Sequence, residues 1–289
     1  MSTETTVEQL NMNRIDLSPM PQSYQALLDR ATEVFQADDR VRAMWLHGAI
    51  ARGAQDAGSD LDIDIAVRDE DFDTFTAEST SWWAHITPTV SRREMAHMPG
   101  SFFALTPTCE RVDVVTERVS DLSASKLTRR VTVFDRDGLT AQVPKPTDLD
   151  ANPEVIRYCI EETLRQAANF PIVLIRQDWL LGVVAVQQIH FLLYELFTEA
   201  NKPMPPTGPK QWSYKLTLEQ RKALENLPVP QAERRSIIAA RLAALRFFEA
   251  QASAVAQRHG VVWPSELAAA VHAYMKRSEG DMSVSDIDW

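Results

Sequence analysis

Three aspartates alternate with aliphatic residues at positions 60–65, where the sequence is Asp-Leu-Asp-Ile-Asp-Ile. Successive side chains of a strand point to opposite faces, so the pattern predicts a strand over residues 60–67 with Asp60, Asp62 and Asp64 on one face. Residues two apart on one face lie about 7 Å apart along the backbone. Carboxylates at this spacing can converge on divalent cations, which favour oxygen ligands. We therefore expect metal chemistry at Asp60 and Asp62, and a structural role for Asp64.

A glycine-containing turn precedes the acidic strand. The largely apolar residues 41–46 predict a strand that ends just before Gly48, and Ala49, Arg52 and Ser59 follow in the connection. Glycine lets the backbone approach a phosphate closely, and the N–H groups of such a turn are good anion donors. Arg52 is either a phosphate contact or a solvated loop residue, and Ser59 either contacts the ligand or orients the turn. The turn and the strand together indicate phosphate and metal chemistry.

The order of an apolar strand, a glycine, a small residue, a spacer and Asp-x-Asp resembles the signature of the polymerase β-like nucleotidyltransferase superfamily. The resemblance implies that Gly48, Ala49, Arg52 and Ser59 contact the triphosphate of ATP or another NTP. It also implies that the two aspartates of the motif bind two Mg²⁺ ions. The family usually has Ser where this chain has Ala49, so one hydroxyl contact to phosphate is missing. That difference predicts weaker nucleotide binding or an atypical substrate.

A third carboxylate is expected on a neighbouring strand. Residues 111–116 have the sequence Arg-Val-Asp-Val-Val-Thr, which places Asp113 between two valines. A charged residue in an apolar strand must be paired, coordinated or at an open face. The resemblance implies a third metal-binding carboxylate in such a setting, so Asp113 is expected to bind the second ion and to accept the proton of the acceptor hydroxyl. Glu110 and Glu117 are the alternatives.

The elements around these residues predict an α+β protein with two domains. Residues 1–150 are expected to form the nucleotidyltransferase domain, a mixed or antiparallel sheet with helices. Its predicted elements are a helix over 23–37 and strands over 41–46, 60–67, 102–105, 111–116 and 131–134. Three prolines in 143–153 indicate a domain boundary near residue 150. Residues 151–289 are expected to form an all-α helical bundle that binds the acceptor and part of the nucleotide. Its predicted helices cover 153–170, 171–200, 219–227, 231–259 and 264–277.

The second half is also similar to the antibiotic nucleotidyltransferases. The sequence Val-Leu-Ile-Arg-Gln-Asp at 173–178 resembles a turn in lincosamide-modifying enzymes, with Arg176 and Asp178 expected to open a helix. Asp178 either binds a cationic acceptor or forms a pair within its helix. The first domain is poor in cations near the motif, so Lys210 and Lys215 are candidates for binding the triphosphate, and ordinary surface lysines are the alternative.

The distribution of charge favours a small acceptor. The net charge is −10, with 15 Lys and Arg against 25 Asp and Glu in residues 1–150 and 15 against 15 in residues 151–289. A protein that binds nucleic acid normally carries a basic surface, so nucleic acid is an unlikely partner and a small, cationic molecule fits better. The polar start and the lack of a long uninterrupted apolar run predict a cytoplasmic protein that does not bind a membrane. A homodimer remains possible.

The expected reaction is therefore the Mg²⁺-dependent transfer of a nucleoside monophosphate, AMP from ATP, to a hydroxyl of a lincosamide or an aminoglycoside, with release of pyrophosphate. Two alternatives remain open. The acceptor could be a protein or an RNA, as in toxin–antitoxin relatives of the superfamily. The chain could also be a nucleotide-binding relative without catalysis, which Ala49 favours and the retained aspartates oppose, since a carboxylate cluster without metal ions repels itself.

Overall fold

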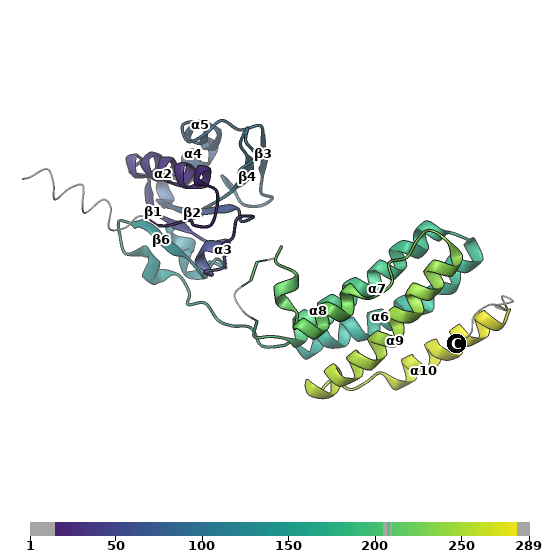
Figure 1. The fold of residues 1–289 in the computed structure, drawn as a ribbon. Coiled ribbons are helices and arrows are strands. Elements are labelled where there is room, and N and C mark those ends of the chain that lie inside the picture. Colours follow the sequence, from purple (N-terminus) through teal and green to yellow (C-terminus); the bar gives the residue numbers. More distant parts are fainter. Residues whose placement is uncertain (1–14, 205–206, 209, 282–289) are drawn as a thin grey trace, which may run out of the picture. The chain divides into compact units, whose positions relative to one another are not determined.

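A computed structural model describes residues 15–204, 207–208 and 210–281 of the chain. The chain divides into two compact units near residue 148 (Figure 1). The first unit contains a six-stranded mixed sheet with helices, and the described elements of the second unit are helices. This combination of a sheet with separate helices confirms the predicted α+β class.

The sheet of the first unit has the strand order β3-β4-β5-β2-β1-β6. Strands β2 and β5 pair in parallel, and the other four neighbouring pairs are antiparallel. Five strands agree with the predicted ones, whereas β3 is not expected from the sequence because its mostly exposed residues show no apolar alternation. The strands are β1 (Val41–Leu46), β2 (Leu61–Val67), β3 (Ser91–Glu94), β4 (Phe102–Leu105), β5 (Arg111–Arg118) and β6 (Val131–Asp135).

One face of the sheet packs on the main core of this unit. Leu61, Ile63 and Ile65 of β2 are fully buried there, as the alternation along the strand predicts. The core also contains buried residues of α2 (Gln22–Ala37), α4 (Phe72–Ala77) and α5 (Ser79–Ala84). Each large apolar side chain buried in this way contributes about 1.5–3 kcal/mol, so the aliphatic side of β2 fixes which side of the strand faces outward.

The opposite face carries the aspartates of β2 and a second, smaller core. This core contains Trp45 of β1 and Ala66 of β2, together with Leu122 and Leu139. The last two belong to short 3-10 helices, η2 (Val119–Ala124) and η3 (Leu139–Gln142). The small core covers only one end of the face, which leaves the end at Asp62 for a site.

The second unit is built from long helices, and one predicted boundary in it is wrong. Pro171 lies inside α6 rather than at the start of the next helix. A proline can remain in a helix when packing compensates for its missing hydrogen bond, and Pro171 is buried beside Phe170 and Val173. The chain leaves α6 at Gln177, which has a left-handed φ of 49°. The elements are α6 (Pro153–Arg176), α7 (Trp179–Ala200), η4 (Ser213–Lys215), α8 (Leu218–Glu225), α9 (Arg234–Arg258) and α10 (Ser265–Asp281).

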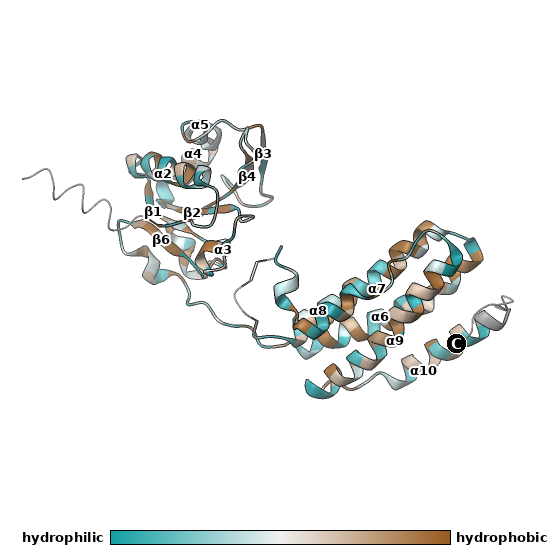
Figure 2. Cartoon of the chain, in the orientation of Figure 1, coloured by the Kyte–Doolittle hydropathy of each residue, from teal (hydrophilic) through white to brown (hydrophobic). Residues whose placement is uncertain are grey.

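Helix α7 is the most apolar of the long helices. Figure 2 shows apolar residues of the helices as brown segments of the ribbon. Among the described helices, it alone is long and apolar enough to cross a membrane by length and composition. Ile189, Leu193 and Phe197 of α7 are buried in the same core as residues of α6 and α9, which is the environment of a central helix in a helical protein.

Candidate active site

Asp62 and Asp113 lie opposite each other on the two parallel strands of the sheet. The register pairs Asp62 of β2 with Asp113 of β5, and partners across a parallel pair point to the same face. Adjacent strands are about 4.8 Å apart, so the two carboxylates start from neighbouring backbone positions. This places two oxygen-rich side chains on the face that the small core leaves uncovered.

The glycine turn lies directly against Asp62. Gly48 has φ +62°, and a Cβ atom built on it would be 1.7 Å from Oδ2 of Asp62. The N–H of His47 donates a hydrogen bond of 3.0 Å to the carbonyl oxygen of Asp62, which ties the end of β1 to the acidic strand. The four-residue helix α3 (Gly48–Ala51) begins at this glycine. Glycine is required here both for its backbone conformation and for the absence of a side chain.

We predict that Gly48→Ala lowers transferase activity by roughly 100-fold, because the new methyl group must displace the carboxylate of Asp62. The left-handed backbone should also cost about 1–2 kcal/mol of stability. Gly53→Ala is a matched control, since Gly53 has φ +64° but nothing within 4 Å of its Cβ position. The Gly53→Ala variant should lose about as much stability as Gly48→Ala but keep the activity of the wild-type protein. Equal activities of the two variants, measured by initial rates, would contradict the prediction.

Asp60 is engaged by an arginine that the sequence analysis did not single out. Nε of Arg111 forms an ion pair with Oδ1 of Asp60, and its Nη2 donates a hydrogen bond of 2.6 Å to the Gly58 carbonyl. The hydrogen bond to Asp60 raises the pKa of Arg111. Arg111 precedes Asp113 by two residues, so a period of two places both side chains on the same face of β5. This spacing is the sequence feature that could have identified Arg111 as a residue of the site.

The donor set fits a divalent cation at two of the three predicted positions. Asp62 and Asp113 offer carboxylate oxygens from adjacent positions, which hard cations favour. Asp60 would have to leave Arg111 before it could join them. Within the described part of the chain, no three His, Cys, Asp or Glu side chains are grouped closely enough to hold a metal ion.

The other residues of the turn have mainly local contacts. The Ala49 carbonyl oxygen accepts hydrogen bonds from the N–H groups of Arg52 (3.2 Å) and Ala54 (3.0 Å). Burial lowers the pKa of Arg52, and the charge of Asp62 opposes this effect. The Ser59 hydroxyl accepts a hydrogen bond of 2.9 Å from the Asp56 N–H, so this serine orients the turn.

A buried cluster of charged residues surrounds Asp64, which follows Asp62 by two residues on the same face of β2. Nη1 of Arg130 lies 2.5 Å from Oδ2 of Asp64, and its Nη2 lies 2.5 Å from Oε2 of Glu117. The Arg130 guanidinium also lies 4.6 Å from the centre of the Trp45 ring. Burial and the charge of Glu117 raise the pKa of Asp64, while Arg130 opposes them. Asp64 therefore has the structural role expected of it, through an ion pair.

Both alternatives to Asp113 have other partners. Glu117 pairs with Arg130, as described above. Glu110 accepts hydrogen bonds from the hydroxyl groups of Thr106 and Thr108, the latter at 2.5 Å. These hydrogen bonds lower the pKa of Glu110 to about 2.

His47 provides a pH-dependent contribution to stability. Burial, followed by the charges of Arg130 and Arg52, lowers the pKa of His47 to about 4. Since its ordinary pKa is about 6.5, the unfolded chain binds a proton that the folded protein excludes between these values. Above pH 6.5 the titration of His47 does not reduce the free energy of unfolding. As the pH falls from 6.5 towards 4, the free energy of unfolding decreases, because only the unfolded chain binds the proton. At 1.36 kcal/mol per pKa unit, the loss amounts to about 3 kcal/mol.

We therefore predict that His47→Gln flattens the dependence of unfolding free energy on pH between 6.5 and 4. Urea unfolding at half-unit pH intervals measures this dependence. His85→Gln, at an exposed position of the same unit, should leave the slope as in the wild-type protein. Identical slopes for the wild-type protein and His47→Gln would show that His47 does not contribute.

The four predicted site residues of the second half all belong to the second unit. Arg176 is the last residue of α6, so the prediction that it opens a helix is wrong. Asp178 is the N-cap of α7, where its carboxylate accepts a hydrogen bond of 3.0 Å from the Leu181 N–H. The break at Gln177 separates the two residues onto different helices. Lys215 ends η4, and Lys210 is an exposed residue preceding it.

The cap gives Asp178 a measurable structural role. We predict that Asp178→Ala lowers the unfolding free energy by about 1 kcal/mol, because one N–H at the start of α7 loses its acceptor. Asp178→Asn should retain most of the stability, since asparagine also caps helices well. Thermal unfolding of the two variants measures the difference. Equal losses in both would exclude the cap as the cause.

No protein-family model and no curated protein sequence matches the chain significantly. Solved structures that match include an aminoglycoside 6-adenyltransferase from Bacillus subtilis, at 13% identity and a TM-score of 0.42, covering 89% of this chain and 97% of that one. A nucleotidyltransferase-like protein from Exiguobacterium sibiricum matches at 14% identity and a TM-score of 0.31, covering 81% and 77%. A CCA-adding enzyme in complex with CTP matches at 13% identity and a TM-score of 0.34, covering 93% and 72%.

These three structures share at most 14% sequence identity with the chain, and their TM-scores are all below 0.5. Their low identities and TM-scores below 0.5 carry neither an activity nor a substrate to this chain. The function therefore has to be inferred from the geometry of Asp62, Asp113 and the glycine turn.

Proposed function

We propose that the chain is a nucleotidyltransferase that transfers a nucleoside monophosphate, AMP from ATP, to a hydroxyl group of a small molecule and releases pyrophosphate. The observation that supports this most is the pairing of Asp62 with Asp113 beside the turn at Gly48. Phosphoryl transfer needs positioning and charge neutralisation more than covalent chemistry by the protein. The glycine turn can position the triphosphate through its backbone N–H groups. The two carboxylates beside it can bind the cation that neutralises the charge of the triphosphate.

Each residue of the site has a distinct proposed task. The turn at Gly48 and Ala49 offers backbone N–H groups to the triphosphate, and Arg52 adds a positive charge near Asp62. Asp62 and Asp113 would hold the divalent cation, and Asp60 would join them once its ion pair with Arg111 opens. Bound Mg²⁺, for which the predicted number is two ions, would neutralise the triphosphate and lower the pKa of the acceptor hydroxyl.

Asp113 is proposed to accept the proton from the acceptor hydroxyl. The freed oxygen then bonds to the α-phosphorus while the bond to the β-phosphate oxygen breaks, and pyrophosphate leaves. Ser59 is assigned to the shape of the turn rather than to the nucleotide, because its hydroxyl already contacts Asp56. This arrangement uses only residues of the first unit for the chemistry.

The acceptor is proposed to be a lincosamide or an aminoglycoside, and a cationic one fits the acidic first half of the chain. In this proposal residues 1–150 form the catalytic domain, and residues 151–289 form a helical bundle that binds the acceptor. Lys210 and Lys215 would contact the triphosphate, while Arg176 and Asp178 would contact the acceptor. A cytoplasmic location and a homodimer are compatible with this activity.

Pyrophosphate release by the full-length protein tests the proposal. The assay combines Mg²⁺ and each of the four NTPs with a panel of lincosamides and aminoglycosides, and Asp62→Asn serves as the inactive control. Release with one drug class, absent from the control, would establish the reaction and the acceptor class. If the panel gives no release while calorimetry detects Mg-ATP binding, the antibiotic acceptor is excluded, and label transfer from ATP to candidate proteins becomes the next test. Absence of both release and nucleotide binding would overturn the proposed activity.

A further inference from the structure

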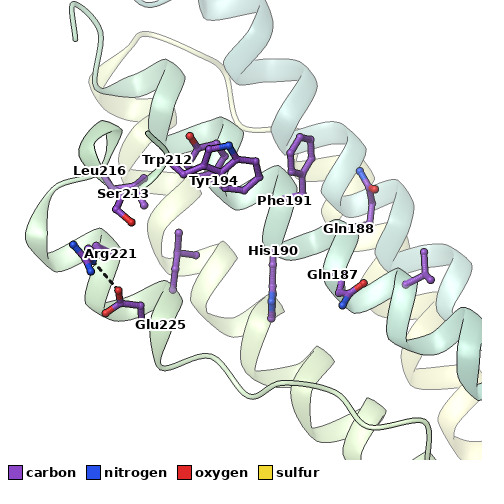
Figure 3. Close-up of a pocket in the computed structure, with 12 residues that line it drawn as sticks. Gln187, Gln188, His190, Phe191, Tyr194, Trp212, Ser213, Leu216, Arg221 and Glu225 are labelled. Carbon is purple, nitrogen blue, oxygen red and sulfur yellow. Dashed lines mark hydrogen bonds and ion pairs between the residues drawn. The ribbon is translucent and has the colours of Figure 1, made fainter. Parts of the chain in front are cut away.

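A separate cavity of about 590 Å³ opens in the second unit, beside α7, η4 and α8 (Figure 3). Its volume lies within the range of about 300–1,000 Å³ that is usual for small-molecule sites. Most of its surface is apolar, with contributions from Val184, Leu216 and Leu224. The residues that line it belong to the second unit, and none of them is used in the proposed transfer reaction.

An aromatic stack forms one wall of this cavity. The ring of Tyr194 stacks on the indole of Trp212, with centroids 4.1 Å apart and planes inclined by 11°. Phe191 lies 5.8 Å from the same indole. Trp212 remains 48% exposed, although Tyr194 covers part of it. A half-exposed indole held by a neighbouring ring is a suitable platform for another planar molecule.

The polar groups of the cavity carry no net charge. Arg221 and Glu225 neutralise each other in an ion pair of 2.7 Å. Burial lowers the pKa of His190, so its imidazole is neutral near pH 7. In the described part of the chain, Nε2 of His190 and the hydroxyl of Tyr194 are buried without a hydrogen-bond partner. A buried polar group without a partner costs about 1–3 kcal/mol, so an incoming polar atom would be stabilised here.

We propose that this cavity binds an uncharged, planar bicyclic molecule with ring nitrogen atoms, stacked on the face of Trp212 opposite Tyr194 with its polar edge towards Gln187 and His190. The apolar lining favours the ring system. Because Arg221 and Glu225 neutralise each other, neither is available to bind a charged ligand. The site would not favour a polycation, because Glu225 is already paired. Its lining includes none of the residues that the proposed function assigns to nucleotidyl transfer.

Titration of the full-length protein with indole and with caffeine, followed by NMR, tests this site. Both probes are neutral, planar and bicyclic. We expect binding of at least one of them, weakened about tenfold or more by Trp212→Ala, which equals about 1.4 kcal/mol. Trp212→Phe should keep affinity within threefold because it retains a ring. Tyr158→Ala is the matched control, since this tyrosine of α6 is 58% exposed and does not line the cavity.

Three results would overturn the proposal. The first is the absence of binding for both probes at millimolar concentration. The second is an affinity that is the same in Trp212→Ala as in the wild-type protein, or one that Trp212→Phe reduces as much as alanine does. The third is displacement of the bound probe by the polycation kanamycin, which would contradict a site for uncharged molecules.

Discussion

Replacement of Asp62 by asparagine is expected to lower nucleotidyl transfer by at least about 10³-fold, the scale on which loss of one charge-stabilising group acts in phosphoryl transfer. Asparagine keeps the shape of the side chain beside Gly48 but removes the negative charge opposite Asp113. Folding should not suffer, because the substitution also removes repulsion between two neighbouring carboxylates. Initial rates of pyrophosphate release and thermal unfolding measure the two effects separately.

Two further variants make this result specific. Asp113→Asn should cause a loss of similar size, because the carboxylates act as a pair. Asp73→Asn is the control, since Asp73 belongs to the same unit and its side chain is 88% exposed. Retention of more than about one tenth of the rate by Asp62→Asn, with an unchanged fold, would exclude Asp62 from the chemistry that the proposal assigns to it.

Replacement of Arg130 by methionine is expected to lower the unfolding free energy of the first unit by about 3–5 kcal/mol, because one partner of a buried charge pair disappears. The side chains of Arg130 and Asp64 are 2% and 0% exposed, so water cannot replace the lost contact. Glu117 would lose its partner in the same step. Urea unfolding followed by tryptophan fluorescence measures the loss, since Trp45 packs on the guanidinium.

Arg30→Met provides the matched comparison. Arg30 pairs with Glu33 on the surface, where the side chains are 50% and 67% exposed, and such pairs contribute at most about 1 kcal/mol. Adding Asp64→Asn to Arg130→Met should recover part of the stability, because asparagine carries no charge to be left buried. A loss below about 1 kcal/mol for Arg130→Met alone would indicate that water reaches the cluster.

The contacts of the candidate site depend on strand register and on distant residues. Arg111 meets Asp60, and Arg130 meets Asp64, only because β5 and the chain before β6 are brought beside β2. The spacing of Arg111 from Asp113 places both residues on one face but does not identify Asp60 as the partner of Arg111, and no local pattern marks Arg130 as the partner of Asp64. The lowered pKa of His47 likewise depends on its burial and on the charges of Arg130 and Arg52. Such pairings follow from long-range packing, which hydrophobic periodicity does not encode.

The sequence alone determined the α+β class, because strand patterns occur in the first half and helix patterns fill the second. It also determined the two faces of β2 and the position of Asp113 on a strand, because the period of two along a strand assigns side chains to faces whatever the neighbouring strands are. The tertiary structure decided which strands are neighbours, and therefore that Asp62 faces Asp113 and that Asp60 is held by Arg111. It also decided that α6 continues through Pro171 to Arg176, because burial of that turn outweighs the local preference of proline. Local preferences are small energies, and packing between distant segments decides wherever the two disagree.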